Sequence, residues 1–171
     1  MKKFINELKE NGTEFSIDGD KVTVYGDLYT SHVFVEELPD GLSIGGSFYL
    51  EQSSIEELPD GLSVSGNLDI SSTNIKELPD GLTVSGYLDI SSTNIKELPA
   101  DLSVGGSLYM TEMYIEALPE GLTVTGDLDI CSSNIKELPD GLSVSGYLYH
   151  DNPSVKIPED FVCKGVIIVT E

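Results

Sequence analysis

The sequence predicts a mainly β, single-domain solenoid in which successive coils stack and share one apolar core. Two periodic series carry this prediction: an LPxxL tract starts every twenty residues, and a glycine recurs at the same spacing. A unit this short cannot enclose a core by itself, so neighbouring copies must share one. The tract leucines are Leu38, Leu58, Leu78, Leu98, Leu118 and Leu138, and the glycines are Gly26, Gly46, Gly66, Gly86, Gly106, Gly126 and Gly146.

The unit from Leu78 to Glu97 reads LPDGLTVSGYLDISSTNIKE. Alternation of apolar and polar residues from Val84 to Ile90 predicts one half-buried strand. Gly86 falls at an inward position of that strand, where a side chain would collide with the opposite wall; alternatively it marks a β-bulge. The residues expected to face inward are Leu82, Val84, Leu88, Ile90, Ile95 and Leu98.

Two turns complete each coil. Pro79 presets φ, and Asp80 with Gly81 supplies turn chemistry, so this tract is expected to bend outside the strand ladder. Two serines follow the strand, where their hydroxyl groups can satisfy turn amides. A ladder of hydroxyl groups is expected along the next column, at Thr73, Thr93 and Ser133.

The two ends differ from the repeats, which span residues 24–156. Residues 1–23 are expected to cap the first coil, with a short amphipathic helix over residues 2–11 and a hairpin after it. The apolar helix face comprises Phe4, Ile5 and Leu8, and in the hairpin Phe15 and Ile17 face Val22 and Val24 across Asp18-Gly19-Asp20.

Residues 157–171 are expected to form a C-terminal capping repeat. They repeat the motif with one residue deleted after Val155, which assigns Gly165 to the glycine column and Ile167 and Val169 to the two positions that follow it. The last strand is more apolar than the others. It either pairs with another copy or relies on Lys164 and Glu171 to discourage that.

Composition limits the class of protein. A length of 171 residues suits one domain, and no apolar run approaches the length of a membrane span. The first residues, MKKFINELKENG, lack the apolar region and cleavage site of a secretory signal. Cys131 and Cys163 are poorly placed for a disulfide, so the reducing cytoplasm is the expected compartment.

The chain is strongly acidic. It carries 30 acidic residues against 9 lysines and no arginine, a formal net charge of -21. Such a surface repels phosphate backbones and anionic lipid, so direct binding to nucleic acid or to a membrane is disfavoured. A basic protein partner, or no partner, is favoured.

Catalytic and metal chemistry are not expected. His32 and His150 lie near opposite ends and in different phases of the repeat, so they cannot share a site with a nucleophile. The sequence has no GxGxxG, P-loop or CxxC motif. A Ca²⁺ site needs about six to eight convergent oxygens, and the acidic columns lack the calcium-binding nonapeptide. We therefore expect a protein without enzymatic activity, cofactor or metal.

Outward strand positions form two columns rich in tyrosine and aspartate. Tyrosine offers a large contact area with a polar tip at little rotamer cost, which favours partner binding. The alternative is that cross-strand aromatic residues simply favour β structure. The tyrosine-aspartate column comprises Tyr29, Tyr49, Asp69, Asp89, Tyr109, Asp129 and Tyr149, and its neighbour, the corner column, comprises Asp27, Ser47, Asn67, Tyr87, Ser107, Asp127 and Tyr147.

Two further columns form acidic ridges. Like charges about 4.8 Å apart repel each other, and Lys76, Lys96 and Lys136 offset only part of that cost. Either the ridges keep the surface solvated, or the net charge of -21, which averages to one charge per roughly 2 Å of rod, imitates the charge density of duplex DNA. The ridges comprise Glu37, Glu57, Glu77, Glu97 and Glu137, and Asp40, Asp60, Asp80, Glu120 and Asp140.

The pattern LxIxxTxI, carried by Leu88, Ile90, Thr93 and Ile95, resembles the leucine-rich repeat core LxLxxNxL over roughly residues 24–157. The recurrent LP resembles the short bacterial class, and the whole unit looks like small LPxxLxVxGxLxLxxTxI proteins of bacteria and their phages. This resemblance implies a repeat fold and no shared activity. Thr or Ser replaces the usual Asn, and VxG adds residues before the strand, so a horseshoe and a straighter β-solenoid both stay open.

Together these features predict a non-enzymatic acidic protein that binds a protein partner. Its sharpest form is a phage-type inhibitor that mimics nucleic-acid charge against a basic host defence or nucleic-acid-binding protein. The alternative is a structural or self-assembling solenoid, joined through its apolar C-terminal strand, whose acidity only maintains solubility.

Overall fold

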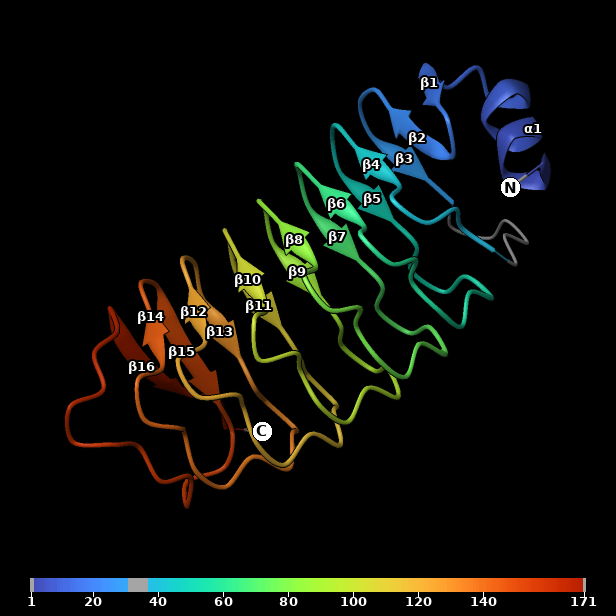
Figure 1. Ribbon diagram of the computed structural model, residues 1–171. Helices are drawn as coiled ribbons and strands as arrows, with labels where there is room; N and C mark the ends of the chain where they lie inside the picture. Colours follow the sequence, from blue (N-terminus) through green and yellow to red (C-terminus); the bar gives the residue numbers. More distant parts are fainter. Residues whose placement is uncertain (1, 31–36, 171) are drawn as a thin grey trace.

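The computed structural model describes residues 2–30 and 37–170 as a β-solenoid of stacked coils with one helix at its N-terminal end. The coils follow one another along a rod, with α1 at one end and β16 at the other (Figure 1). The strands lie on one side of the rod and irregular arcs complete each coil on the other. The mainly β, stacked architecture predicted from the repeat is confirmed.

Each coil contributes one short strand to each of two sheets, and strands from successive coils pair in parallel. Sheet A contains β1 (Phe15–Asp18), β2 (Lys21–Val24), β4 (Ser43–Ile44), β6 (Ser63–Val64), β8 (Thr83–Val84), β10 (Ser103–Val104), β12 (Thr123–Val124) and β14 (Ser143–Val144). Sheet B contains β3 (Leu28–Tyr29), β5 (Phe48–Tyr49), β7 (Leu68–Asp69), β9 (Leu88–Asp89), β11 (Leu108–Tyr109), β13 (Leu128–Asp129), β15 (Tyr147–His150) and β16 (Gly165–Ile168).

The single strand predicted from Val84 to Ile90 is wrong, because the backbone bends at Ser85 and Gly86. The chain leaves sheet A after β8 and enters sheet B at β9. The inward alternation survives the bend, since apolar side chains before and after it face the same core. The sequence pattern therefore predicts correctly which residues face inward, but it predicts one strand where the structure has two.

Gly86 lies at this corner for a reason other than the predicted one. A Cβ on Gly86 would meet the Asn67 side chain and would lie 2.8 Å from the C and O atoms of Gly66. These atoms belong to the preceding coil and not to the opposite wall. The Gly86 N–H donates to Gly66 O at 2.8 Å, so the corner backbones of adjacent coils approach too closely for a side chain.

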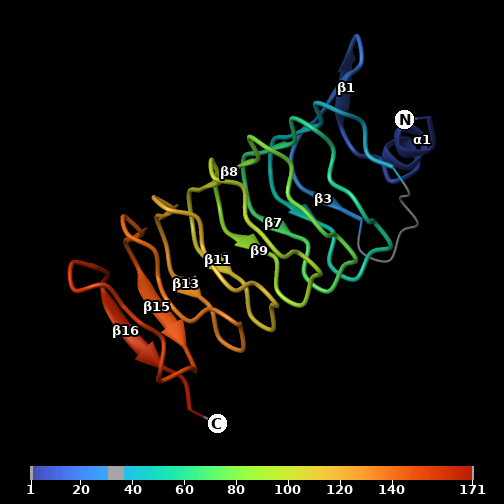
Figure 2. The ribbon, with the colours of Figure 1, turned by 60° about the horizontal axis from the view of Figure 1, so that its bottom comes forward.

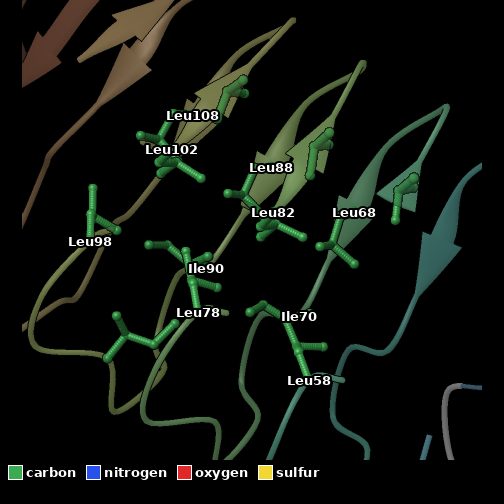
Figure 3. Packing of buried hydrophobic residues seen from close by; sticks show 14 of the residues in the cluster. Leu58, Leu68, Ile70, Leu78, Leu82, Leu88, Ile90, Leu98, Leu102 and Leu108 are labelled. Atoms are coloured by element: carbon green, nitrogen blue, oxygen red, sulfur yellow. The ribbon is translucent and has the colours of Figure 1, made fainter. Parts of the chain in front are cut away.

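The shared core runs through all the repeats. Every residue predicted to face inward in the unit 78–97 is buried, and Leu98 of the next unit is buried too. Figure 3 shows Leu68, Leu88 and Leu108 of successive coils pointing into the same interior. Burial of such a side chain contributes about 1.5–3 kcal/mol before conformational entropy is counted.

The LPDG tract forms the predicted turn. Gly81 has φ of +70°, and the Leu82 N–H donates to Pro79 O at 3.3 Å. The hydroxyl column behaves differently from the prediction: Thr73 and Thr93 each donate at 2.7 Å to the carbonyl three residues back, within their own coil. Ser133 does the same at 2.7 Å, so each of these hydroxyl groups stabilises its own turn. Oγ1 of Thr93 also lies 3.5 Å from Sδ of Met113 in the next coil, and among the described residues the three hydroxyl groups do not bond to one another.

The N-terminal end is covered by α1 (Lys2–Glu10), whose Phe4, Ile5 and Leu8 are buried. The predicted hairpin is confirmed, since Phe15 pairs with Val24 and Ile17 with Val22. β2 also pairs in parallel with β4, so it joins the hairpin to the stacked coils of sheet A, and the boundary proposed between residues 23 and 24 lies within this strand.

The C-terminal strand differs from its predicted phase by one residue. Lys164, and not Gly165, lies opposite Gly146 and donates its N–H to Gly146 O at 2.8 Å. In β16, Val166 consequently pairs with Leu148 and Ile168 with His150, whereas Ile167 pairs with the outward Tyr149. A slip of one residue exchanges the faces of a strand, so Val166 and Ile168 face inward here.

Among residues 2–30 and 37–170, no helix has the length and apolar character needed to cross a membrane.

Candidate partner-binding face

The tyrosine-aspartate column predicted from the sequence lies in one row on sheet B. Its residues are direct partners in the parallel register, from Tyr29 with Tyr49 through Asp69 with Asp89 to Asp129 with Tyr149. The strands that carry the row follow one another along the rod in Figure 2. The structure thus brings all seven predicted side chains of this column onto one face.

The three aspartates of the column also hold the turn that follows each strand. Oδ1 of Asp69 accepts the N–H of Ser71 at 3.0 Å and the Ser71 hydroxyl at 2.6 Å. Oδ1 of Asp89 and of Asp129 accepts the corresponding N–H at 2.9 and 3.0 Å. Each carboxylate is therefore fixed in orientation through one oxygen before any partner arrives.

The negative charge of Asp89 is costly in the folded protein, chiefly because the side chain is partly buried. Burial raises the pKa of Asp89 above its ordinary value, the Ser91 hydrogen bonds lower it, and the charges of Asp69 and Asp129 raise it again. A cation placed over this part of the column would relieve the repulsion between the carboxylates.

The tyrosines associate in pairs along the same face. The rings of Tyr29 and Tyr49 are stacked, with centroids 4.9 Å apart and planes 13° apart. Tyr87 and Tyr109 meet edge to face at 5.8 Å. Burial, followed by the nearby Tyr49 and the Asp69 carboxylate, raises the pKa of Tyr87 to about 12. This hydroxyl group is consequently a neutral hydrogen-bond donor at physiological pH.

The pair Tyr147 and Tyr149, with ring centroids 6.3 Å apart, closes the row beside β16. The ammonium of Lys164 lies 4.7 Å from the centroid of the Tyr147 ring, a cation–π contact. The aromatic face thus already accepts one cation from the chain itself.

The corner column has a structural role that the sequence did not reveal. Its side-chain oxygens accept backbone N–H groups of the following coil: Asp27 from Ser47 at 2.7 Å, Ser47 from Asn67 at 3.1 Å, and Asn67 from Tyr87 at 3.0 Å. The same pattern continues further along the rod, where the Ser107 hydroxyl oxygen accepts the Asp127 N–H at 2.9 Å and Oδ1 of Asp127 accepts the Tyr147 N–H at 2.8 Å. One oxygen of Asp127, a predicted binding residue, is therefore engaged in joining coils.

The acidic ridges lie in the turn between the arc and sheet A, away from the tyrosine-aspartate column. All ten predicted ridge residues are exposed. Glu57, Asp60, Glu77 and Asp80 line one depression of about 320 Å³ between adjacent coils. Lys76, Lys96 and Lys136 form no ion pair within 2–30 and 37–170, whereas Lys156 contacts Glu137 at 3.3 Å on the exposed surface.

The two histidines and the two cysteines are the side chains that could carry catalytic chemistry. His150 is buried, and its Nδ1 lies 2.9 Å from the carbonyl oxygen of Asn152, so Nδ1 donates the hydrogen bond and the carbonyl oxygen accepts it. His32 lies outside the described residues. Cys131 and Cys163 are free thiols, and burial together with the Asp129 carboxylate raises the pKa of Cys131 to about 12. Within the described part of the chain, no three His, Cys, Asp or Glu side chains are grouped to hold a metal ion.

One surface feature was not anticipated from the sequence. Tyr114, with 73 % of its surface exposed, borders a depression of about 660 Å³ that also includes Lys96, Ala117 and Pro119. Ala117 interrupts the acidic ridge formed by Glu97 and Glu137, and this interruption was the available sequence signal.

Comparison of the chain with protein families, with curated proteins and with solved structures finds no match.

Proposed function

We propose that this chain is a non-enzymatic binding protein that receives a basic protein partner on the tyrosine-aspartate column. The main support for this proposal is that paired tyrosines and aspartates lie in a single row. Oδ1 of each aspartate in this row already accepts a turn N–H. Carboxylates held in this way lose little conformational freedom on binding, and tyrosines add apolar contact. Lysine or arginine side chains of a partner suit both groups.

The net charge of -21 supports the same partner class, since long-range attraction steers a basic protein toward the rod. The ridges on the turn side extend the negative charge around the axis. In its most specific form the proposal is an inhibitor that imitates nucleic-acid charge and occupies the basic groove of a host defence or nucleic-acid-binding protein. We further place the protein in the cytoplasm, in keeping with its two free thiols, and among leucine-rich-repeat-like proteins of bacteria or phages.

The test compares two triple variants as baits in a lysate of the native host. Asp69, Asp89 and Asp129 are changed to Asn in one, and Glu57, Glu77 and Glu97 to Gln in the other. Both reduce the formal net charge from -21 to -18. Asparagine keeps the Oδ1 acceptor of the turn, so the fold is retained while the charge is removed.

We expect a basic protein to be retained by the wild type and by the Gln variant, to elute as salt is raised, and to be lost from the Asn variant. Purified partner should then associate with the Asn variant more slowly than with the wild type. If both variants lost the partner equally, binding would depend on net charge alone and not on the tyrosine-aspartate column. Partner binding that is insensitive to salt would overturn the proposal.

A further inference from the structure

The outer edge of β16 presents unused backbone hydrogen-bonding groups. In the inner coils, Leu88 and Ile90 donate their N–H groups at 2.9 Å to carbonyls of the following coil. The register places Val166 and Ile168 at the equivalent positions of the last coil. β16 ends sheet B, and no described residue pairs with its outer side. The N–H and C=O groups of Val166 and Ile168 therefore point to an open edge.

The same two residues expose the end of the core. Leu148, the register partner of Val166, is fully buried, whereas Val166 and Ile168 keep 44 % and 55 % of their surface exposed. Ile157 of the same coil is 36 % exposed. At the opposite end α1 covers the first coil, while no described helix covers the last one (Figure 1). The edge is therefore apolar as well as unpaired.

This end also carries little of the negative charge of the chain. Residues 156–171 contain Lys156 and Lys164 against Glu159, Asp160 and Glu171, a formal charge of -1 in a chain of -21. Lys164 lies over the Tyr147 ring of its own sheet. Two copies of so acidic a protein repel each other over most of their surfaces, and the last coil is a place where they can approach at low cost.

We propose that two copies join end to end through β16 around a two-fold axis. An axis perpendicular to sheet B makes the two β16 strands antiparallel and keeps the inward side chains of both copies on the core side. With the axis at Ile167, Val166 lies opposite Ile168 of the second copy. Each of the two resulting residue pairs exchanges two N–H to C=O bonds, so the strands share four backbone hydrogen bonds.

This proposal is independent of the partner-binding face, because that face lies on the outward side of sheet B from β3 to β15, whereas the proposed contact uses the outer edge of β16. The two are also opposite in their salt dependence. Attraction between the acidic face and a basic partner weakens as salt is added, whereas repulsion between two acidic copies is screened and their self-association strengthens. A failure of one proposal therefore leaves the other testable.

The test measures the mass of the 171-residue chain by sedimentation equilibrium over a range of protein concentrations at low and high salt. We expect a monomer of 18.5 kDa in equilibrium with a dimer of twice that mass, and a larger dimer fraction at high salt. Ile168→Lys places a charge in the joint core and should weaken dimerisation by about tenfold or more.

Two further variants control this result. Ile17→Lys makes the same charge change on β1, an edge strand at the opposite end where Ile17 is 49 % exposed, and should leave the dimer intact. Val166→Pro removes an N–H that points to the open edge and breaks no bond to β15, so it should abolish the dimer while the circular dichroism spectrum is unchanged.

Four results would each overturn the proposal: a monomer at every concentration and salt level, species that keep growing beyond the dimer, a dimer that survives both Ile168→Lys and Val166→Pro, or a dimer lost in Ile17→Lys. Growth beyond the dimer would indicate head-to-tail contacts, which do not close as a two-fold contact does.

Discussion

Replacing Gly86 with alanine tests how the coils are spaced. The new Cβ would lie 2.8 Å from the C and O atoms of Gly66, and an ordinary contact begins at 3.4 Å, so the two coils must separate locally by about 0.6 Å. That displacement stretches the 2.8 Å hydrogen bond from the Gly86 N–H to Gly66 O. It also pushes the Asn67 side chain away from the Tyr87 N–H, which it now accepts at 3.0 Å.

The expected cost follows from these contacts. Overpacking against backbone costs about 1–3 kcal/mol, and each weakened hydrogen bond adds about 1 kcal/mol, so Gly86→Ala should destabilise the protein by roughly 3–5 kcal/mol. The matched control is Gly81→Ala. Gly81 has φ of +70°, but a Cβ added there would meet nothing within 4 Å, so only the left-handed strain of about 1–2 kcal/mol applies.

Urea unfolding followed by circular dichroism measures both variants, and both change the unfolded chain in the same way because each replaces one glycine with alanine. The expected order of stability is wild type, Gly81→Ala, then Gly86→Ala. If Gly86→Ala unfolds at the same urea concentration as Gly81→Ala, or later, close approach between coils is not what requires this glycine.

Three further predictions concern buried or coil-joining groups, all measured by urea unfolding. Thr93→Val removes the hydroxyl that donates at 2.7 Å to a carbonyl of its own turn and should cost about 1–2 kcal/mol, whereas Thr93→Ser should cost less; equal losses would contradict a role for the hydroxyl. Asp127→Ala leaves the Tyr147 N–H without its acceptor and should cost about 1–3 kcal/mol, while Asp127→Asn restores an acceptor and most of the stability. The pKa of Asp89 is raised in the folded protein, so its ionisation destabilises the fold at neutral pH. Relative to Asp89→Asn, the wild type should therefore gain stability as pH falls through the raised folded pKa, and a constant difference between about pH 7 and pH 4 would contradict this shift.

The repeat period predicted the stacking and the inward residues because both follow directly from chain geometry. It did not predict the corner at Ser85 and Gly86, since the chain keeps its inward and outward alternation through the bend and one strand looks the same as two. The predicted register of β16 was wrong for a different reason. Residues 166–169 are all apolar, so no polar position marks the outward face and the register depends on contacts with β15.

The candidate site was likewise predicted only in part. Alignment of the tyrosine-aspartate column followed from the period, but the bonds of its aspartates did not enter the prediction. Asp69 followed two residues later by Ser71 is a pattern typical of an Asx turn, and it was a signal available in the sequence. The corner column was harder to interpret, because Asp27, Ser47 and Asn67 differ in chemistry and share only an oxygen that reaches the next coil.

The choice between tyrosine and aspartate in the column is not imposed by the turn. Coils with aspartate place Ser72, Ser92 and Ser132 at φ of 54–56°, and coils with tyrosine place Gln52 and Glu112 at 56–57°. The same backbone therefore forms with either residue.

In the coil that contains β11, the column residue is Tyr109. There the Ser91 hydroxyl oxygen of the preceding coil accepts the Thr111 N–H at 3.2 Å. An aspartate is thus dispensable for turn formation, although burial, together with the charge of the neighbouring Asp69, makes the ionised form of Asp89 costly. A charged residue that the fold does not require, kept where it destabilises the folded state, supports recognition as the reason for its presence. By the same reasoning Asp89→Tyr should fold with its turn intact, and its effect should appear in partner binding.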